Sequence, residues 1–473
     1  MVTRYHFSGI AGAGMNLLAQ LVRARGHAVQ GSDRSLDQGK QAALAARLRT
    51  LGVTLLPHDG TAITQDIERF VYSTAVEAET PEMRTARHLG IPMIPRPALL
   101  AEIVNTGEPG VAVAGTSGKS TITGMVAWLL REGGVPATVL GGAALVGDGP
   151  GGCFMAGPAR GDGRGGGWGD GRGGGWGPVV AEACESDGTL AGYRPAVGII
   201  HNISRDHGEL ETLRPQFTAF ADQTSRLLVN ARCPEALALG RRFKAVVYGA
   251  TADASARLDV GAVGPDRARG TLRIDGRVVT LDLPQPGLHT LENAAAATMV
   301  ALELGLEPVT IARALARFPG VTRRFEVVGL TPSGIRVVDD YAHNGEKLRA
   351  AITAAQAGGT RVVAVFQPHG FGPARFLRAE LAELLPRTLR SQDRFCYAEI
   401  FYAGGTVAKD ISSAMLAGDL PAALRCGYAA DHRAAREWVA AEAWDGDTVL
   451  IMGARDPDLP ALARGIFDAL AAR

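Results

Sequence analysis

The sequence predicts an α/β protein of three domains built on largely parallel sheets. Strand-like runs alternate with helix-like runs almost throughout the 473 residues, which is typical of parallel strands joined by helices. A chain of this length suggests about three domains, at roughly 150 residues for each domain. Stretches of glycine and proline at 107–110 and 318–320 mark two linkers, so the predicted domains are 1–107, 108–320 and 321–473.

The first predicted domain begins with an apolar run at 5–10, a helical pattern at 15–25 and a short strand at 28–30. The turn after the first strand carries the small residues Gly9, Ala11, Gly12, Ala13 and Gly14. Such a turn before a helix binds a diphosphate, and Asp33, after the next strand, is placed for a ribose hydroxyl. The glycine spacing differs from GxGxxG, so nicotinamide binding has weak support, and a purely structural tight turn is the alternative.

The strongest chemical motif opens the second domain, between an apolar strand at 111–114 and a helix at 119–130. Its residues are Gly115, Thr116, Ser117, Gly118, Lys119, Ser120 and Thr121. Glycines let backbone N–H groups point at phosphate oxygens, and the helix N-terminus adds partial positive charge. Lys119 then reaches the β- and γ-phosphates of ATP, and Ser120 binds Mg²⁺. Val113 stands where the strict motif has its first glycine, but the strand–loop–helix context disfavours the alternative of a solvated turn.

Two polar segments at the ends of later strands complete a predicted metal site. Glu182 ends an apolar strand and begins the acidic segment 182–187, whereas His207 closes the segment 202–207, which follows a strand at 197–200. Carboxylate oxygens suit Mg²⁺, and open α/β sheets bind ligands at such strand ends. A solvated acidic loop and a hydrogen-bonded loop histidine are the alternatives.

The remaining elements continue the α/β pattern to the end of the chain. Further strands are predicted at 179–181, 227–229, 272–274, 277–281, 335–338, 362–366, 395–398 and 448–452. Further helices are predicted at 290–304, 309–317 and 374–385. Asp275-Gly276 separates two of these strands, which is a strong hairpin signal.

One segment has low complexity, because DGRGGGWG at 162–169 is repeated without change at 170–177. We expect a flexible surface loop, since so much glycine buries too little apolar surface to offset its backbone entropy. A mobile cover that uses Trp168 and Trp176 as contacts is the alternative.

The composition excludes several classes of protein. A net charge of +1 lacks the basic footprint of a nucleic-acid-binding protein. The five cysteines are scattered without CxxC spacing, so neither a disulfide framework nor a zinc site is expected, which fits a reducing cytosol. No signal-peptide pattern and no apolar run of the ~18 residues that a membrane helix needs is found. We therefore expect a cytoplasmic protein with no membrane and no nucleic-acid partner.

Ordered segments over the whole length resemble the Mur ligase family, and within it the branch that joins alanine to UDP-N-acetylmuramate. The matching segments are 6–15, 31–33, 115–121, 182–187, 202–207, 289–294, 323–326, 339–343 and 366–369. The resemblance implies a Rossmann-like N-terminal domain, a P-loop ATPase central domain and a Rossmann-like C-terminal domain. It also implies ATP and Mg²⁺ as cofactors, a UDP-sugar carboxylate and an amino acid as substrates, a role in peptidoglycan precursor synthesis, and a monomer or weak homodimer.

The family reaction follows from the resemblance. The substrate carboxylate attacks the γ-phosphorus to give an acyl phosphate, and the amine of the amino acid then displaces phosphate. Carried over by position, Lys119 would hold the phosphates, Ser120 and Glu182 one Mg²⁺, and His207 a second Mg²⁺. Arg324 would contact the γ-phosphate side. Catalysis would then be mostly positioning and charge neutralisation.

The remaining site residues are also implied by the resemblance. Asn293 would contact adenine and Asp340 the ATP ribose, while Ser73 and Thr74 would hold the UDP part together with the N-terminal glycines. In the C-terminal domain the substrate-side residues are Tyr341, His343, His369 and Arg375.

The chain departs from this branch at several positions. Ser117 replaces a histidine, Cys184 an aspartate and Thr290 an asparagine, and Asn344-Gly345 replaces His-Pro. Arginines usually follow the segment 366–369, but this chain has Gly370, Phe371, Gly372 and Pro373, with Arg375 two residues later. We expect Arg375 to take over the acceptor carboxylate, because a bidentate arginine holds that group best.

Three alternative functions remain open. A muropeptide-recycling ligase would attach a tripeptide to UDP-N-acetylmuramate, and the segment 395–398 resembles that branch. A dinucleotide-dependent oxidoreductase would use the N-terminal turn but leaves the motif at 115–121 unexplained. A nonenzymatic ATP-switched binding protein would bind ATP without turnover.

Overall fold

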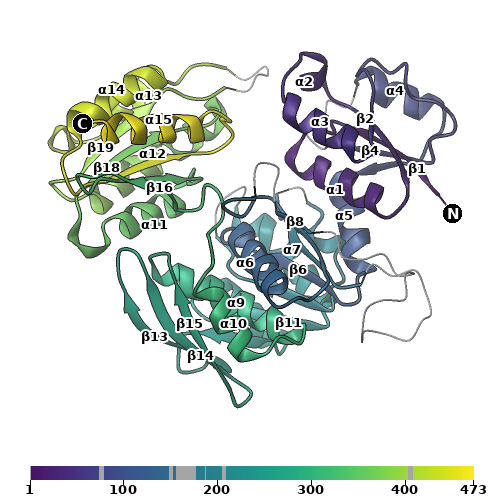
Figure 1. The fold of residues 1–473 in the computed structure, drawn as a ribbon, viewed down its shortest axis with the longest axis horizontal. Helices are drawn as coiled ribbons and strands as arrows, with labels where there is room; N and C mark the ends of the chain where they lie inside the picture. Colours follow the sequence, from purple (N-terminus) through teal and green to yellow (C-terminus); the bar gives the residue numbers. More distant parts are fainter. Residues whose placement is uncertain are drawn as a thin grey trace. The chain divides into compact units, whose positions relative to one another are not determined.

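The strands of the computed structural model form three sheets, and most neighbouring strands are parallel (Figure 1). The structure describes residues 2–73, 79–148, 153–155, 177–186, 188–204, 209–402 and 408–473. The predicted α/β class is confirmed. The repeat at 162–177 lies outside the described residues except for Gly177.

The chain forms two compact units. One unit comprises Met1–Val260, Gly270–Leu281 and Glu292–Phe318, and the other comprises Gly261–Arg269, Asp282–Leu291 and Pro319–Arg473. The division into domains 1–107, 108–320 and 321–473 stays a prediction.

The first sheet has the strand order β3-β2-β1-β4-β5, with all neighbours parallel. Its strands are β1 (Arg4–Ser8), β2 (Ala28–Ser32), β3 (Thr54–Leu55), β4 (Arg69–Tyr72) and β5 (Met93–Pro95). Its helices are α1 (Ala13–Ala24), α2 (Arg34–Asp37), α3 (Ala42–Thr50), α4 (Pro81–His88) and α5 (Arg96–Asn105). The order reverses between β1 and β4, and open α/β sheets bind ligands at such a switch point.

The second sheet has the strand order β15-β14-β13-β12-β11-β10-β6-β9-β7-β8. Its strands are β6 (Gly110–Ala114), β7 (Thr138–Gly141), β8 (Cys153–Met155), β9 (Val179–Ala183), β10 (Val197–Ile200), β11 (Arg226–Asn230), β12 (Val246–Gly249), β13 (Ala256–Val263), β14 (Ala268–Ile274) and β15 (Arg277–Leu283). The helical elements are α6 (Lys119–Glu132), η1 (Leu190–Gly192), α7 (Leu210–Gln223), α8 (Pro234–Arg242), α9 (Leu288–Glu303) and α10 (Pro308–Leu315). The hairpin predicted at Asp275-Gly276 is present, and both residues have the positive φ, 47° and 73°, that a type I′ turn requires.

The third sheet has the strand order β16-β17-β21-β18-β19-β20, in which β16 is antiparallel to β17 and the other neighbours run parallel. Its strands are β16 (Glu326–Leu330), β17 (Arg336–Asp340), β18 (Val362–Gln367), β19 (Arg394–Ala398), β20 (Gly427–Ala429) and β21 (Thr448–Gly453). The helical elements are α11 (Gly345–Ala355), η2 (Ala357–Gly359), α12 (Phe371–Thr388), α13 (Ser413–Gly418), η3 (Ala422–Leu424), α14 (His432–Glu442) and α15 (Leu459–Ala471).

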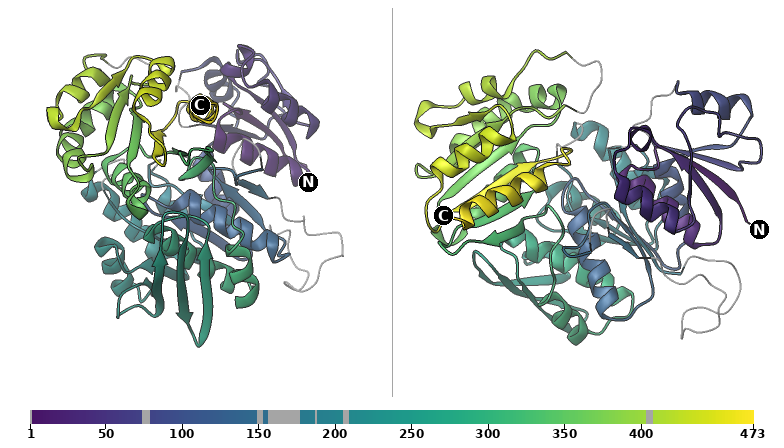
Figure 2. Two further views of the ribbon diagram at one scale, coloured as in Figure 1. Left: turned by 60° about the vertical axis from the view of Figure 1, so that its left-hand side comes forward. Right: turned by 45° about the horizontal axis from the view of Figure 1, so that its top comes forward.

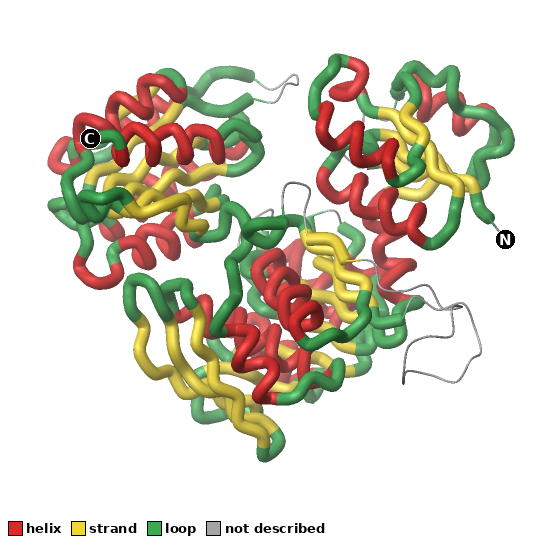
Figure 3. Tube along the Cα trace, in the orientation of Figure 1, coloured by secondary structure: helices red, strands yellow, loops and turns green. Residues whose placement is uncertain are grey.

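Alternating side chains of the third sheet pack on helices at its two faces. Val362, Ala364 and Phe366 pack with α11, α12 and α13, whereas Val363 and Val365 pack with α14 and α15. Figures 2 and 3 show the strands between these helices. Successive side chains of a strand point to opposite faces, and both faces of this sheet are covered, so every residue of β18 is buried, including the polar Gln367 at its end.

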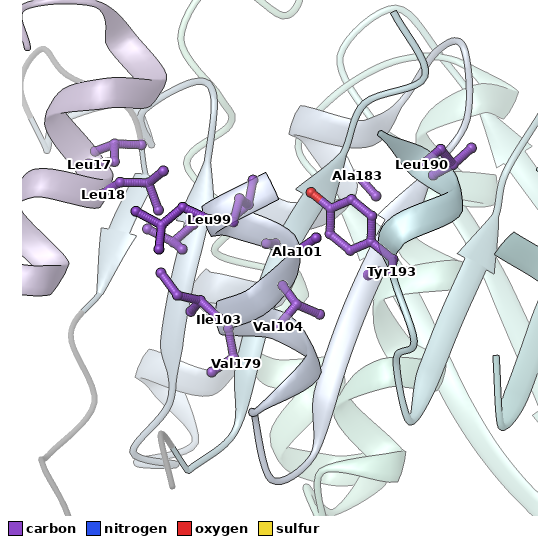
Figure 4. Close-up of a cluster of buried hydrophobic side chains, with 14 of the residues drawn as sticks. Leu17, Leu18, Leu99, Ala101, Ile103, Val104, Val179, Ala183, Leu190 and Tyr193 are labelled. Carbon is purple, nitrogen blue, oxygen red and sulfur yellow. The ribbon is translucent and has the colours of Figure 1, made fainter. Parts of the chain in front are cut away.

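Helix α5 packs within one buried cluster that spans two sheets of the first unit. Leu99 and Ile103 of α5 lie in one cluster with Leu17 and Leu18 of α1 and with Val179 of β9 (Figure 4). The helix thereby joins the elements after β1 to the strand that leads to the acidic segment.

Within the described residues, we find no helix with the length and apolar character needed to cross a bilayer.

Candidate functional site

The phosphate loop lies at the carboxyl end of β6, between that strand and α6. Gly115 and Gly118 have φ values of 147° and 84°, which a side chain disfavours. Asn202, after the neighbouring strand β10, holds the loop: its Oδ1 accepts a hydrogen bond of 2.8 Å from the backbone N–H of Ser117 and one of 3.0 Å from the hydroxyl of Thr116. The loop is therefore shaped before any phosphate binds.

Polar groups without partners face this loop within the described part of the chain. The hydroxyl of Ser117 and Oδ1 of Asn293, in α9, are buried and have no hydrogen-bond partner. A Cβ atom on Gly118 would lie 2.8 Å from Oδ1 of Asn293, so the two groups approach closely. Buried polar groups without partners are rare in folded proteins, and they fit a site that a polar ligand completes.

Lys119 begins α6 and points back at the loop. Its Nζ donates to the carbonyl of Gly115 and lies 2.8 Å from Oε2 of the buried Glu185. Burial by itself lowers the pKa of Lys119, but the negative charge of Glu185 raises it above its ordinary value. The ammonium group therefore stays charged at the position where phosphate oxygens are expected.

Ser120 in the first turn of α6 meets Glu182 of β9, and β6, the strand before α6, is the neighbour of β9. The hydroxyl of Ser120 donates to Oε2 of Glu182 over 3.1 Å, and Oε1 of Glu182 accepts a 2.5 Å bond from the N–H of Gly142. Among the described residues no group of three His, Cys, Asp or Glu side chains is placed to hold a metal. A hydroxyl and a carboxylate still fit Mg²⁺, which takes few protein oxygens and keeps several waters.

Four further predicted positions are Thr121, Asp187, His207 and Thr74. Thr121 lies in the first turn of α6. His207 and Asp187 lie outside the described residues, as does Thr74 of the first domain. Their predicted roles stay predictions.

The N-terminal turn follows β1 in the chain and is hydrogen-bonded to the end of β2. The backbone N–H groups of Gly9 and Ile10 donate to the carbonyl of Ser32 at 2.8 and 3.0 Å, and Gly9 has a φ of 82°. Helix α1 begins at once, so its N-terminus provides the partial positive charge that favours a diphosphate. Gly12 and Gly14 lie at this helix start, where Arg96 lies 3.2 Å from the position of a Cβ on Gly14.

Asp33 has a structural role at the same turn. Its Oδ2 accepts a 3.0 Å bond from the N–H of Ala11, and its Oδ1 caps α2 by accepting a 2.8 Å bond from the N–H of Ser35. Ser73 follows β4, and its N–H donates to the carbonyl of Ser8 over 3.3 Å. Contact of Asp33 with a ribose stays a prediction.

Two arginines lie over the ring of Tyr341 in the second unit, and Asp340 precedes this tyrosine in the chain. The guanidinium carbons of Arg323 and Arg324 lie 5.0 and 4.7 Å from the ring centroid of Tyr341. Asp340 accepts 2.7 Å bonds from the N–H groups of Phe325 and Ala342, and burial raises the pKa of its carboxyl. Arg323 and Phe325 have φ values of 58° and 51°, an unusual conformation that often marks functional segments.

His343 lies next to Tyr341, and His369 lies next to His343. The rings of His343 and His369 meet edge to face at 5.3 Å, and Nδ1 of His343 lies 2.8 Å from the carbonyl oxygen of Tyr341. The guanidinium of Arg375, in the first turns of α12, instead contacts the carboxylate of Asp410. The structure thus brings Tyr341, His343 and His369 together. The acceptor role of Arg375 stays a prediction.

Sequence reasoning missed two supports of the phosphate loop. Asn202 is 85 residues from Ser117, and the segment 202–207 gave no sign that its first side chain binds the loop. His201 is buried behind Gly118, and its Nδ1 lies 2.6 Å from the hydroxyl of Tyr248. Neither pairing leaves a signal in one sequence, because the partners come from different strands.

Comparison with known proteins gives matches over both ends of the chain. A family model described as "Mur ligase family, catalytic domain" matches residues 4–107, and one described as "Mur ligase, glutamate ligase domain" matches residues 323–455. The UDP-N-acetylmuramate--L-alanine ligase of Kineococcus radiotolerans is 38% identical over 474 residues, covering 96% of this chain and 93% of that protein. The ligase of the same name from Caulobacter vibrioides is 34% identical over 475 residues, covering 95% and 93%.

Solved structures agree in fold. The UDP-N-acetylmuramate-alanine ligase of Thermotoga maritima has a TM-score of 0.75 at 24% identity and covers 99% of each chain. A murein peptide ligase from Psychrobacter arcticus has a TM-score of 0.66 at 20% identity and covers 100% of this chain and 99% of that chain. At these identities the similarity concerns the fold, and it matches the α/β architecture described above.

Proposed function

The chain belongs to the Mur ligase family, and we propose that it joins L-alanine to the carboxylate of UDP-N-acetylmuramate with conversion of ATP to ADP and phosphate. The observation that carries the proposal is the group at the carboxyl ends of β6 and β9. There the preshaped phosphate loop, the charged Lys119 and the Ser120–Glu182 pair lie together. Relatives that are 38% and 34% identical over nearly the whole chain carry the name of this reaction, which supports the choice of substrates.

The reaction proceeds through an acyl phosphate. The substrate carboxylate attacks the γ-phosphorus of ATP, and the amine of the amino acid then displaces phosphate from the acyl carbon to leave an amide. The ammonium of Lys119, which lies 2.8 Å from Glu185 at the phosphate loop, neutralises charge that develops on the phosphates. Most of the rate enhancement comes from such positioning and neutralisation.

Magnesium fits the oxygen donors at this site. Ser120 and Glu182 would hold one Mg²⁺, and His207 is proposed for a second ion. When bound, Mg²⁺ neutralises charge on the transferring phosphoryl group.

The other predicted residues are assigned to the binding of ATP, of the sugar nucleotide or of the amino-acid acceptor. Asn293 contacts adenine, Asp340 contacts the ATP ribose, and Arg324 contacts the γ-phosphate side. The glycine turn, with Asp33, Ser73 and Thr74, holds the UDP part. The residues assigned to the acceptor side are Tyr341, His343, His369 and Arg375. The enzyme is proposed to act in the cytoplasm, as a monomer or weak homodimer.

A second candidate function is addition of a peptide to UDP-N-acetylmuramate. The observation that favours it is the sequence after His369, where Gly370, Gly372 and Pro373 provide no charge for an amino-acid carboxylate. A tripeptide acceptor has other groups by which it can be held.

One assay separates the two functions. Phosphate release is measured with ATP, Mg²⁺ and UDP-N-acetylmuramate against L-alanine, other amino acids and a tripeptide. Turnover with L-alanine above all other acceptors supports the first proposal. Turnover with the tripeptide alone replaces it by the second, and no turnover with any acceptor rejects both.

A further inference from the structure

A buried carboxylate lies beneath the N-terminal glycine turn. Glu82, in the first turn of α4, has no solvent exposure. Its Oε2 accepts a 2.6 Å hydrogen bond from the hydroxyl of Ser8, and its Oε1 accepts a 2.5 Å bond from the hydroxyl of Ser32. A buried charge is costly unless it is paired and hydrogen-bonded, so this arrangement needs a reason beyond packing.

Two histidines lie beside this carboxylate. Nδ1 of His58 lies 2.9 Å from Oε2 of Glu82 and 2.9 Å from the hydroxyl oxygen of Ser32. Nε2 of His6 lies 3.2 Å from Oε1 of Glu82, and the His6 ring stacks on Phe70 at 5.3 Å. The carboxylate therefore has partners on β1, on β2 and in the segment after β3.

The two serines are the last residues of the strands that carry the turn. Ser8 ends β1 and Ser32 ends β2, and the carbonyl of Ser32 accepts hydrogen bonds from the N–H groups of Gly9 and Ile10. A shift of either strand end would move the backbone N–H groups that point into the turn.

We infer that Glu82 is a positioning residue for sugar-nucleotide binding, because its carboxylate ties Ser8 at the end of β1 to Ser32 at the end of β2. This inference rests on the proposed function of the turn as the UDP site. Glu82 does not touch the nucleotide; it holds in place the backbone that does.

The charges of the group make this support dependent on pH. Burial alone would raise the pKa of Glu82, but hydrogen bonds from His58 and His6 lower it well below its usual range. The pKa of His58 is raised overall, first by its hydrogen bond to Glu82 and further by the negative charges of Glu82 and Asp33. Burial and the positive charge of Arg34 act in the opposite direction. Since the folded-state pKa of His58 is raised, its ion pair is fully present below the unfolded value of 6.5 and is lost as pH rises through the folded value.

The test compares Glu82→Gln with Glu79→Gln, an exposed glutamate that pairs with Arg87 near the same helix. UDP binding is measured by calorimetry at neutral pH without ATP, and KM is measured for UDP-N-acetylmuramate and for ATP. Glu82→Gln should weaken UDP binding and raise the sugar-nucleotide KM about tenfold, the scale of one lost hydrogen bond, while the KM for ATP changes little. Glu79→Gln should match the parent.

A second variant tests the role of Glu82 without removing the buried carboxylate, and a pH series tests the contribution of His58. Ser32→Ala removes one of the bonds and should give a smaller loss of UDP affinity with a normal melting transition. UDP-N-acetylmuramate binding to the parent should weaken as pH rises from about 6 to about 9, and Glu82→Gln should lose this dependence because it lacks the partner of His58.

The outcomes separate this inference from the proposed function. Equal UDP affinity in folded Glu82→Gln and parent, or an equal rise of both KM values, overturns the role of Glu82. UDP binding without turnover of L-alanine overturns only the acceptor assignment. A parent protein that does not bind UDP overturns both.

Discussion

Nζ of Lys119 lies 2.8 Å from Oε2 of Glu185, although the two residues are 66 positions apart in the chain. The pair joins the first residue of α6 to the loop after β9, so the cation that is proposed to meet ATP is already paired. This relationship gives Lys119 two roles: its ammonium neutralises the buried Glu185 and is proposed to neutralise the phosphates of ATP. It also separates the contribution of Lys119 to stability from its contribution to catalysis.

Lys119→Ala should lower turnover by about 10²–10³, the usual cost of losing one preorganised stabilising group. It should also lower stability by about 3–5 kcal/mol, because Glu185 is left buried without its partner. Phosphate release and thermal melting measure the two effects. The double variant with Glu185→Gln should recover the melting temperature but not the turnover. Near-normal turnover in folded Lys119→Ala would reject the role of Lys119.

Glu182→Ala should raise the Mg²⁺ concentration needed for activity, because Glu182 is the carboxylate beside the Ser120 hydroxyl. Phosphate release is followed while Mg²⁺ is titrated. Glu211→Ala provides the control, since that side chain is 74% exposed on α7. If the Mg²⁺ titrations of Glu182→Ala and the parent coincide, Glu182 does not hold the metal.

Gly118→Ala should raise the KM for ATP, since its Cβ would lie 2.8 Å from Oδ1 of Asn293 and 2.9 Å from Cδ2 of His201. Gly134→Ala is the matched control: Gly134 has a similar φ of 66° but no atom within 4 Å of the added Cβ. Both variants should lose roughly 1–2 kcal/mol of stability from the left-handed backbone. Equal KM values for ATP in the two variants would show that the approach to Asn293 is unimportant.

Arg375→Ala should raise the KM for L-alanine and leave the KM for ATP little changed. The guanidinium contacts Asp410, but an exposed ion pair of this kind contributes little to stability, so an acceptor carboxylate can compete for the guanidinium. Arg378→Ala is the control, because Arg378 lies on the same helix and pairs with Asp419 in the same way. A parent-like KM for L-alanine in Arg375→Ala would mean that another group holds the acceptor.

The sequence by itself determined many of the helices and strands and the positions of the main site motifs along the chain. The strand at 197–200 has the same bounds in the structure, and the helix expected from Lys119 begins there. These features depend on local pattern: apolar runs form strands, and a glycine turn with a following lysine forms a phosphate loop in any α/β context. The ordered motifs were also sufficient to indicate the Mur ligase family.

Only the tertiary structure decided which strands are neighbours and which of these motifs contact each other. β21, the last strand of the chain, lies between β17 and β18, and Glu82 joins Ser8 to Ser32 from 74 and 50 residues away. Asn202 holds the phosphate loop from a neighbouring strand. Strand order and buried polar pairing depend on how helices and sheets pack over long distances in the chain. A single sequence records that a residue is polar or apolar, but the partner of a buried charge is selected only when the whole core closes around it.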